Sequence, residues 1–277
     1  MDAVDGGFAK SCRFTGHPTK TAFINLGKIN LLTIPFLILV FLFCSEVPEV
    51  RPIPTERIVL AELFTWARCP YCPYAARTLD SLAKEYNDSV AIIAYHRRIG
   101  GDTLSPDLVE RRRSFYYEAG GEPAVLFDGT GPVWTTDPNQ NYPTYKNYII
   151  GRRNKKSPLR LHLETLVRAD TGIIKTTVVV TDSIPTGDLR ILTVVYEDSV
   201  RFRLPGASDS VFNRVMRLMI PDENGIACTL SFRDSIAKEV RFSLNQTWRQ
   251  SQLGVVGFVQ NFATKEVIQA IFKKGLE

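Results

Sequence analysis

The stretch IVLAELFTWARCPYCPYAA, residues 58–76, determines the fold that we expect for this chain. Its first part, 58–64, is apolar apart from one glutamate, as in strands that are buried on both faces of a central sheet. A Cys-x-x-Cys pair, Cys69 and Cys72, follows shortly afterwards. From Ala75 onward, apolar residues recur at intervals of three and four, which predicts an amphipathic helix. We therefore expect the cysteine pair at the start of a helix that follows a buried strand.

The segments after this helix predict a mixed α/β region that extends over 57–151. A second apolar run, 90–95, completes a strand–helix–strand unit with a parallel sheet. A helix is expected over 107–118, because Ser-Pro precedes it and two glycines follow it. The run 124–127 predicts a further strand, which ends at the turn signal Asp-Gly. A closing helix is expected over 142–153.

The pattern changes after a basic, proline-ended segment, 152–158, which we predict to be a linker between two domains. Beyond it, residues 159–164 alternate between apolar and polar side chains, as in a strand with one buried face. Several such strands with turn residues between them predict an antiparallel β-sandwich over 159–277. The further strand candidates are 174–181, 189–196, 240–244, 253–259 and 267–272.

The N-terminal part of the chain has the pattern of an export segment. Residues 29–45 carry no charge, and they have lysine and arginine before them and glutamate after them. The run is also close to the shortest that can span a bilayer. We predict that 1–45 is an export signal or membrane anchor, that 46–56 is a linker, and that the rest of the chain lies outside the cytoplasm. Cys44 closes the run, and it is a candidate for lipidation against a signal anchor or ordinary cleavage.

The composition is that of an ordinary globular protein, with 44% hydrophobic and 23% charged residues in 277. The net charge of +5 is mild, and the arginine clusters at 97–98, 111–113 and 152–153 predict solvated surfaces. A nucleic-acid-binding protein would have a more continuous basic face, so we expect no nucleic-acid partner. There is no nucleotide-binding loop, serine-nucleophile signal or paired-carboxylate pattern, and we expect no cofactor.

The Cys69–Cys72 pair is the chemical centre of the sequence. At a helix start, unpaired N–H groups and the helix dipole lower the pKa of the first cysteine and favour its thiolate. We therefore expect a surface-accessible dithiol in which Cys69 attacks and Cys72 resolves the mixed disulfide. Arg68 places a positive charge beside Cys69 and would lower its pKa further. Two alternatives remain open: a static disulfide, and a metal site, for which one Cys-x-x-Cys supplies only two of the usual four zinc ligands.

This arrangement resembles the thioredoxin superfamily: a strand, Cys-x-x-Cys at a helix start, a βαβ unit and a proline before a later strand. The resemblance implies that Pro123 forms a cis peptide bond with Glu122 and lies against the dithiol, where it helps bind the client chain. With Pro123, it implies that Glu122, Tyr71 and Pro70 belong to the substrate-binding surface. The Cys-Pro-Tyr-Cys tetrapeptide is the one found in glutaredoxins.

A larger set of motifs resembles the Omp28-related outer-membrane lipoproteins, over roughly residues 57–270. That family joins a thioredoxin-like domain to an Ig-like β domain, so the resemblance implies an α/β thioredoxin-like fold over 57–151 and an all-β Ig-like sandwich over 159–277. The motifs are Phe64-Thr65, Cys-Pro-Tyr-Cys-Pro at 69–73, Leu79-Asp80-Ser81-Leu82, Ala94-Tyr95-His96, the run Glu122–Gly129, the run Val256–Asn261, and Lys265-Glu266-Val267.

Two positions differ from the thioredoxin pattern. Arg68 stands where thioredoxins have tryptophan, and Leu63 stands where they have a buried acid that assists proton transfer. Glu62 lies one residue earlier, on the opposite face of a regular strand. These differences favour an oxidising or isomerising role over disulfide reduction.

We interpret the sequence as an exported, membrane-attached thiol–disulfide oxidoreductase of the cell envelope. Its expected partners are protein thiols and disulfides, a redox partner protein, and the membrane, through the N-terminal segment or a lipid. The alternative is a non-catalytic surface binding module in which the disulfide is structural. Cys228 is expected to be a buried small apolar residue, and His96 a satisfied histidine at a strand end.

Overall fold

The computed structural model describes residues 53–87, 89–135 and 137–276. These residues belong to one compact unit that is mostly β-structure, with three α-helices. The predicted export segment, including Cys44, lies outside the described residues, as does most of the expected linker 46–56. Within the described part of the chain, no helix is long and apolar enough to cross a membrane.

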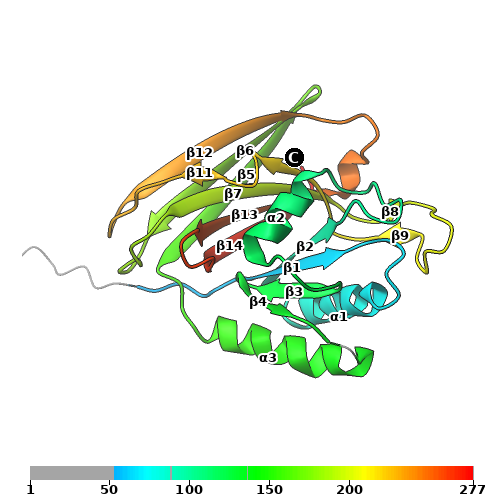
Figure 1. Cartoon of the computed structure of the whole chain (residues 1–277). Coiled ribbons are helices and arrows are strands. Elements are labelled where there is room, and N and C mark those ends of the chain that lie inside the picture. The colour runs from blue at the N-terminus through cyan, green and yellow to red at the C-terminus, as the bar shows by residue number, and fades with distance from the viewer. Residues whose placement is uncertain (1–52, 88, 136, 277) are drawn as a thin grey trace, which may run out of the picture. The chain divides into compact units, whose positions relative to one another are not determined.

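Nine strands form one sheet in the order β14-β13-β7-β10-β2-β1-β3-β4, with β11 paired to β7 (Figure 1). The central pair, β1 and β2, is parallel, and β3 and β4 continue the sheet in antiparallel pairing. The predicted parallel strand–helix–strand unit is thus present. The strands are β1 (Val59–Thr65), β2 (Val90–His96), β3 (Ala124–Phe127), β4 (Thr130–Val133), β7 (Leu189–Glu197), β10 (Val215–Ile220), β11 (Ile226–Ala227), β13 (Leu253–Asn261) and β14 (Val267–Lys274).

Both faces of β1 are buried, which explains its nearly continuous apolar sequence. Because side chains alternate along a strand, Val59, Ala61 and Leu63 face one side and pack with helices α1 (Cys72–Glu85) and α3 (Asn141–Arg153). Leu60 and Phe64 face the other side, in the core that includes helix α2 (Leu108–Tyr116). Figure 1 shows α1 and α3 on one face of the sheet and α2 on the other.

A second sheet of three strands packs on the C-terminal part of the large one. Its order is β12-β6-β5, with β5 (Leu159–Arg168), β6 (Thr171–Val180) and β12 (Ser235–Ser243) (Figure 1). Ile174 and Val178 of β6 meet Val195 and Val259 of the large sheet in the cores between the layers. Every strand predicted after residue 158 coincides with or overlaps an observed strand, and the prediction of packed β layers in this region is confirmed.

The large sheet crosses the expected linker between the two predicted domains. Strand β10, from the C-terminal range, pairs in parallel with β2 through Val215 and Ala94. This pairing gives the edge of β2 a partner that the N-terminal range alone does not provide. The expected linker 152–158 also begins inside helix α3, because Arg152 and Arg153 are its last residues. The two ranges therefore share one sheet, and the two-domain division stays a prediction.

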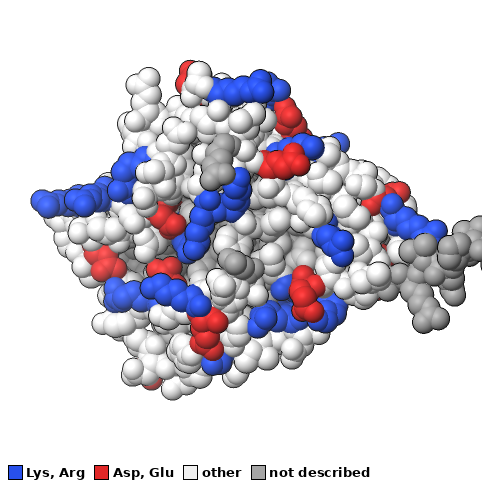
Figure 2. Space-filling view, turned by 180° about the vertical axis from the view of Figure 1, so that it is seen from behind, with Lys and Arg blue, Asp and Glu red and all other residues white. Residues whose placement is uncertain are grey.

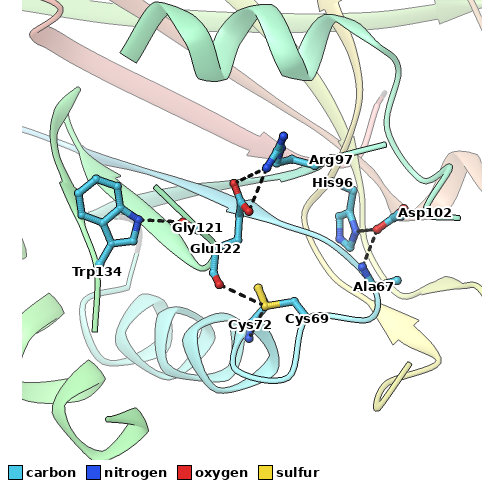
Figure 3. The surroundings of a disulfide bond; sticks show 9 residues. All are labelled: Ala67, Cys69, Cys72, His96, Arg97, Asp102, Gly121, Glu122 and Trp134. Carbon is cyan, nitrogen blue, oxygen red and sulfur yellow. Dashed lines mark hydrogen bonds and ion pairs between the residues drawn. A yellow bond between two sulfur atoms is a disulfide. The ribbon is translucent and has the colours of Figure 1, made fainter. Parts of the chain in front are cut away.

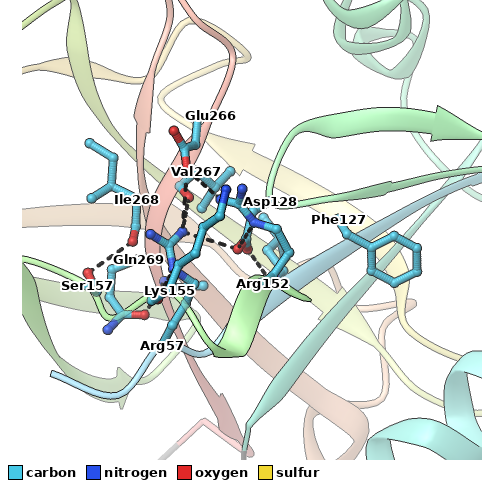
Figure 4. A network of polar contacts seen from close by, with 12 residues as sticks. Arg57, Phe127, Asp128, Arg152, Lys155, Ser157, Glu266, Val267, Ile268 and Gln269 are labelled. Carbon is cyan, nitrogen blue, oxygen red and sulfur yellow. Dashed lines mark hydrogen bonds and ion pairs between the residues drawn. The ribbon is translucent and has the colours of Figure 1, made fainter. Parts of the chain in front are cut away.

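A buried ionic network joins these ranges at the start of β1 (Figure 4). The Asp128 carboxylate accepts hydrogen bonds from Leu60 N at 2.8 Å, Arg57 at 3.2 Å and Arg152 at 2.9 Å. Arg152 also contacts Glu266 at 2.5 Å. Burial raises the pKa of Asp128, and the two arginines oppose that shift. A Cβ on the neighbouring Gly129 would lie 1.9 Å from the backbone oxygen of Lys265, in the turn before β14, so the turn after β3 accepts only glycine.

Candidate redox site

The structure joins Cys69 and Cys72 in a disulfide at the N-terminus of α1. Helix α1 begins at Cys72, with Pro73 in its first turn, where a missing N–H costs no helical hydrogen bond. The free amide of Cys72 donates to the Cys69 sulfur over 3.1 Å (Figure 3). The predicted position of the pair at a helix start is confirmed. The N-terminal amide and the helix dipole both favour negative charge on the Cys69 sulfur.

Both sulfur-bearing side chains are buried, so the prediction of a surface-accessible dithiol is wrong for this disulfide form. Cys69 is 1% exposed and Cys72 is 2% exposed. Arg68, Pro70 and Tyr71 around them are exposed, and Tyr71 reaches 52%. The pair therefore lies just beneath the surface, where the neighbouring loops cover the sulfur atoms.

The loop before β3 forms one wall of the site. The Glu122–Pro123 peptide bond is cis, as predicted, and the Glu122 carbonyl oxygen lies 3.6 Å from the Cys69 sulfur (Figure 3). Pro123 is buried. The structure thus brings together the two segments that the sequence indicated, residues 69–72 and 122–123. Their separation of 53 residues along the chain makes this contact a product of the fold.

Two arginines and a tryptophan hold this loop in place, and sequence reasoning missed all three. The Glu122 carboxylate accepts from Arg97 at 3.0 Å and from Arg113 at 3.1 Å (Figure 3 shows the Arg97 contact). Arg113 also donates to the Gly120 carbonyl at 2.7 Å. The Trp134 indole N–H donates to the next carbonyl, that of Gly121, at 2.8 Å. These contacts fix the backbone whose carbonyl faces Cys69.

The arginine clusters were expected as solvated surfaces, and the structure corrects this expectation. Arg113 turns toward the loop, and Arg112 is fully buried with its guanidinium 2.8 Å from Glu62. In these clusters Arg98 and Arg111 are exposed as expected, and on the face in Figure 2 basic and acidic residues are interspersed. The signal available in the sequence was Glu62 itself, since a carboxylate inside a buried strand requires a buried partner.

Glu62 lies on the face of β1 opposite Leu63, as the alternation predicted. Its carboxylate accepts from Arg112, from Tyr95 at 2.9 Å and from Tyr116 at 2.5 Å. Burial raises the pKa of both tyrosines well above their usual range, so both stay protonated and donate. Glu62 is thus fully occupied on the α2 side of the sheet. The α1 side has Leu63 at that point and no acid.

A pocket lies beside Cys72 on the α1 side of the sheet. Its lining includes Cys72 and Leu63, Trp66 after β1, His96 at the end of β2, and Phe212 from a two-stranded hairpin. That hairpin, β8 (Val200–Arg201) and β9 (Val211–Phe212), connects β7 to β10. The pocket therefore contains residues from both predicted domain ranges.

His96 is paired with a buried carboxylate, and the prediction of a satisfied strand-end histidine is confirmed. Its Nδ1 lies 2.8 Å from Asp102 (Figure 3). Asp102 also accepts from the backbone N–H groups of Ala67 at 2.7 Å and Leu104 at 2.9 Å. The loop that leads into the cysteine pair is thereby tied to the loop after β2.

The remaining candidate residues are placed as follows. Arg68 is exposed and forms no hydrogen bond or ion pair within the described residues, so its effect on the pKa of Cys69 stays a prediction. Cys228 is a half-buried free thiol, and burial raises its pKa to about 11. Within the described ranges, no group of histidine, cysteine and acidic side chains is arranged to hold a metal ion.

Comparisons with known proteins support the fold. No protein-family model matches the chain, and no curated protein sequence matches it either. Among solved structures, the chain is similar to HBP35 of Porphyromonas gingivalis, with 18% identity and a TM-score of 0.67, over 79% of this chain and 76% of that one. It is also similar to a structural-genomics target from Agrobacterium tumefaciens, with 14% identity and a TM-score of 0.53, over 81% and 97%. A domain of the outer membrane lipoprotein Omp28 from Porphyromonas gingivalis matches at 10% identity, over 43% and 89%, but its TM-score of 0.33 carries no weight. The first two likenesses establish the fold and leave the activity to be argued from the site.

Proposed function

We propose that residues 57–151 form a thioredoxin-like region and that the protein is a thiol–disulfide oxidoreductase acting on protein clients. One observation carries the proposal: the Cys69 sulfur lies between the Cys72 amide at 3.1 Å and the Glu122 carbonyl at 3.6 Å. The amide stabilises a thiolate on Cys69. The carbonyl precedes Pro123 and is a backbone acceptor beside the reacting sulfur, where an extended client chain can bind.

In the oxidising direction, a client thiolate attacks the Cys69 sulfur, and the Cys69–Cys72 bond breaks. Cys72 leaves with the bonding electron pair and takes up a proton. A second client thiolate then attacks the client sulfur of the mixed disulfide and releases Cys69 as a thiolate. The client gains a disulfide and the protein gains two electrons, which a redox partner protein with its own disulfide removes.

Two features of the site favour oxidation or isomerisation over reduction. The Cys72 amide and the exposed Arg68 both stabilise the reduced form, which raises the reduction potential. Leu63 supplies no buried acid on the α1 side of the sheet. The export pattern of residues 1–45 directs the domain to an oxidising compartment, where such chemistry is useful. We propose membrane attachment through this segment or through lipid on Cys44.

The burial of both sulfur atoms favours a second candidate function. A disulfide that stays oxidised and covered would leave this region as a scaffold, and the protein would be a surface binding module. The two functions differ in the stability of the disulfide, because structural disulfides have potentials below about −300 mV.

A redox titration of the full-length protein tests the proposal. The protein is equilibrated in thiol–disulfide buffers, alkylated, and read by mass spectrometry on the peptide that contains Cys69 and Cys72. We expect a midpoint between about −230 and −120 mV. Cys72→Ser should accumulate mixed disulfides with clients through Cys69, and the matched variant Cys69→Ser should accumulate none. A midpoint below about −300 mV, with neither variant trapping clients, establishes the binding-module alternative.

A further inference from the structure

The resolving cysteine has a proton-transfer problem that its burial creates. Cys72 is 2% exposed, and an apolar environment disfavours a thiolate, whether the thiolate attacks or leaves. Cys72 must lose a proton before it resolves a mixed disulfide, and it must gain one after it leaves the Cys69 sulfur. A titratable group that lines the pocket beside Cys72 can accept and return that proton. Leu63 stands where the thioredoxin pattern has a buried acid for this purpose, and its side chain cannot transfer a proton.

The pocket beside Cys72 contains four other titratable side chains: Arg77, Asp80, His96 and Asp209. Asp209 forms an ion pair with Arg77 at 3.2 Å, and the Arg77 side chain is 58% exposed. Asp80 accepts from the Asn213 amide at 3.2 Å in an exposed contact. These three groups lie in solvated contacts. His96 is 2% exposed and lines the same pocket. Of these four side chains it is the buried one that can accept a proton from Cys72.

Asp102 orients the His96 ring for this task. The Asp102 carboxylate lies 2.8 Å from Nδ1 and accepts a hydrogen bond from it. The neutral ring therefore carries its hydrogen on Nδ1 and its lone pair on Nε2. Asp102 does not line the pocket, whereas Phe212 does and meets the His96 ring edge-on at 5.1 Å between centroids. Nε2 is therefore the nitrogen left to face the pocket.

We propose that His96 is the proton acceptor and donor for Cys72, acting across the pocket, and that Asp102 is its positioning residue. In resolution, the Cys72 S–H proton passes to His96 Nε2 through pocket water, and the Cys72 sulfur attacks the Cys69 sulfur. The Cys69–client bond breaks, and the client leaves as a thiolate. In the oxidising direction, the imidazolium returns the proton to Cys72 as it leaves. This inference rests on the proposed redox function.

The reaction of the reduced full-length protein with dithiobis-nitrobenzoate separates the two cysteines in time. In the first phase Cys69 breaks the reagent disulfide and releases one thionitrobenzoate. In the second phase Cys72 displaces the other thionitrobenzoate from Cys69 and gives up its proton. Stopped-flow absorbance records both rates from about pH 6 to about pH 9, because the thiol of free cysteine ionises near 8.5. The background carries serine at Cys12, Cys44 and Cys228.

His96→Asn is the decisive variant, since its amide can donate to Asp102 in place of Nδ1 and cannot take up a proton. We expect the second phase to slow at least tenfold at about pH 7, within the usual contribution of general acid–base catalysis of roughly 10²–10⁴. The gap should narrow as the pH rises, because the fraction of Cys72 thiolate that forms without His96 grows with pH even below the pKa of a buried thiol. The first phase should stay unchanged. His162→Asn, on the exposed face of β5, is the matched control and should change neither phase.

The outcomes are distinguishable. An unchanged second phase in His96→Asn overturns the assignment, and so does slowing by one factor at every pH, which marks a structural role for the His96–Asp102 pair. His96→Gln repeats the test if the asparagine variant fails to fold. Absence of the first phase in the wild-type background overturns the proposed redox function itself, and the His96 assignment with it.

Discussion

The two ends of strand β1 differ in how completely their polar groups are satisfied. At its start, the Asp128 carboxylate is buried and meets Leu60, Arg57 and Arg152, and Arg152 continues to Glu266. Past its end, the chain reaches a cysteine pair beside a pocket. The first end joins segments that are far apart in the sequence and leaves no group free to react. At the second end, the polar contacts are made to the Glu122 loop. The two sulfur atoms, which are the reacting atoms, therefore take no part in an ionic network.

The difference teaches where stability and reactivity lie in this fold. Buried ionic networks make a poor reaction site, because every displaced contact leaves an uncompensated charge. A disulfide carries no charge, and it can open without such a loss when the leaving thiolate takes up a proton. We therefore expect changes at the start of β1 to lower stability, and changes past its end to alter the chemistry.

The largest effect is expected from Asp128→Ala. It leaves Arg57 and Arg152 buried without their carboxylate and leaves the Leu60 N–H unpaired, so the free energy of unfolding should fall by roughly 3–5 kcal/mol. Urea unfolding followed by circular dichroism measures the change. Asp128→Asn keeps the size and removes the charge, and it should cost nearly as much.

A matched control for this variant is Glu164→Ala, which breaks the exposed pair with Lys175 on β5 and β6. It should leave the urea midpoint essentially unchanged, because exposed pairs contribute little. If Asp128→Ala unfolds at the same urea concentration as the wild type, the start of β1 is not the rigid end that we describe.

An intermediate effect is expected from Arg113→Ala. Arg113 donates to the Glu122 carboxylate and to the Gly120 carbonyl, and hydrogen bonds that involve a charged group contribute about 1.5–3 kcal/mol. Stability should fall by about that amount. Because the loop then loses its fixed position beside Cys69, the rate at which Cys69 reacts with a disulfide-containing peptide should fall as well.

The comparison variant for the loop is Arg111→Ala, one helix position away from the buried Arg112 and paired with Glu223 at the surface. It should alter neither unfolding nor the reaction with the peptide. Equal reaction rates for Arg113→Ala and the wild type would show that the Glu122 loop does not determine how Cys69 meets its client.

The smallest effect is expected from Arg68, which is exposed and touches neither network. Arg68→Gln removes the positive charge beside Cys69, and Arg68→Trp also restores the residue of the thioredoxin pattern. Both should lower the reduction potential by up to a few tens of millivolts, where about 30 mV corresponds to about 1.4 kcal/mol for two electrons. Equilibration with glutathione buffers measures the shift. A potential that rises in both variants contradicts the assigned role of Arg68.

The sequence alone determined the local elements around the site. The apolar run of β1, the position of Cys69 and Cys72 at the start of α1, and the cis bond before Pro123 were predicted and are present. Six of the strands after residue 158 were also predicted, whereas β8, β9, β10 and β11 were not. The strands and the position of the cysteine pair follow from periodicity, turn residues and a short motif, each of which acts over a few neighbouring positions. The cis bond was implied by the resemblance to the thioredoxin superfamily.

The tertiary structure decided everything that depends on contacts between distant segments. The parallel pairing of Val215 with Ala94 joins the two predicted ranges in one sheet, and no local pattern specifies which edge a strand joins. The burial of the cysteines and the placement of His96 in the pocket of Cys72 depend on loops that arrive from elsewhere in the chain. The hydrogen-bond partners of Arg97, Arg112 and Arg113 also could not be predicted from the sequence. A long, flexible cation has the same sequence signature whether it ends in water or against a buried carboxylate, and only the folded chain distinguishes the two.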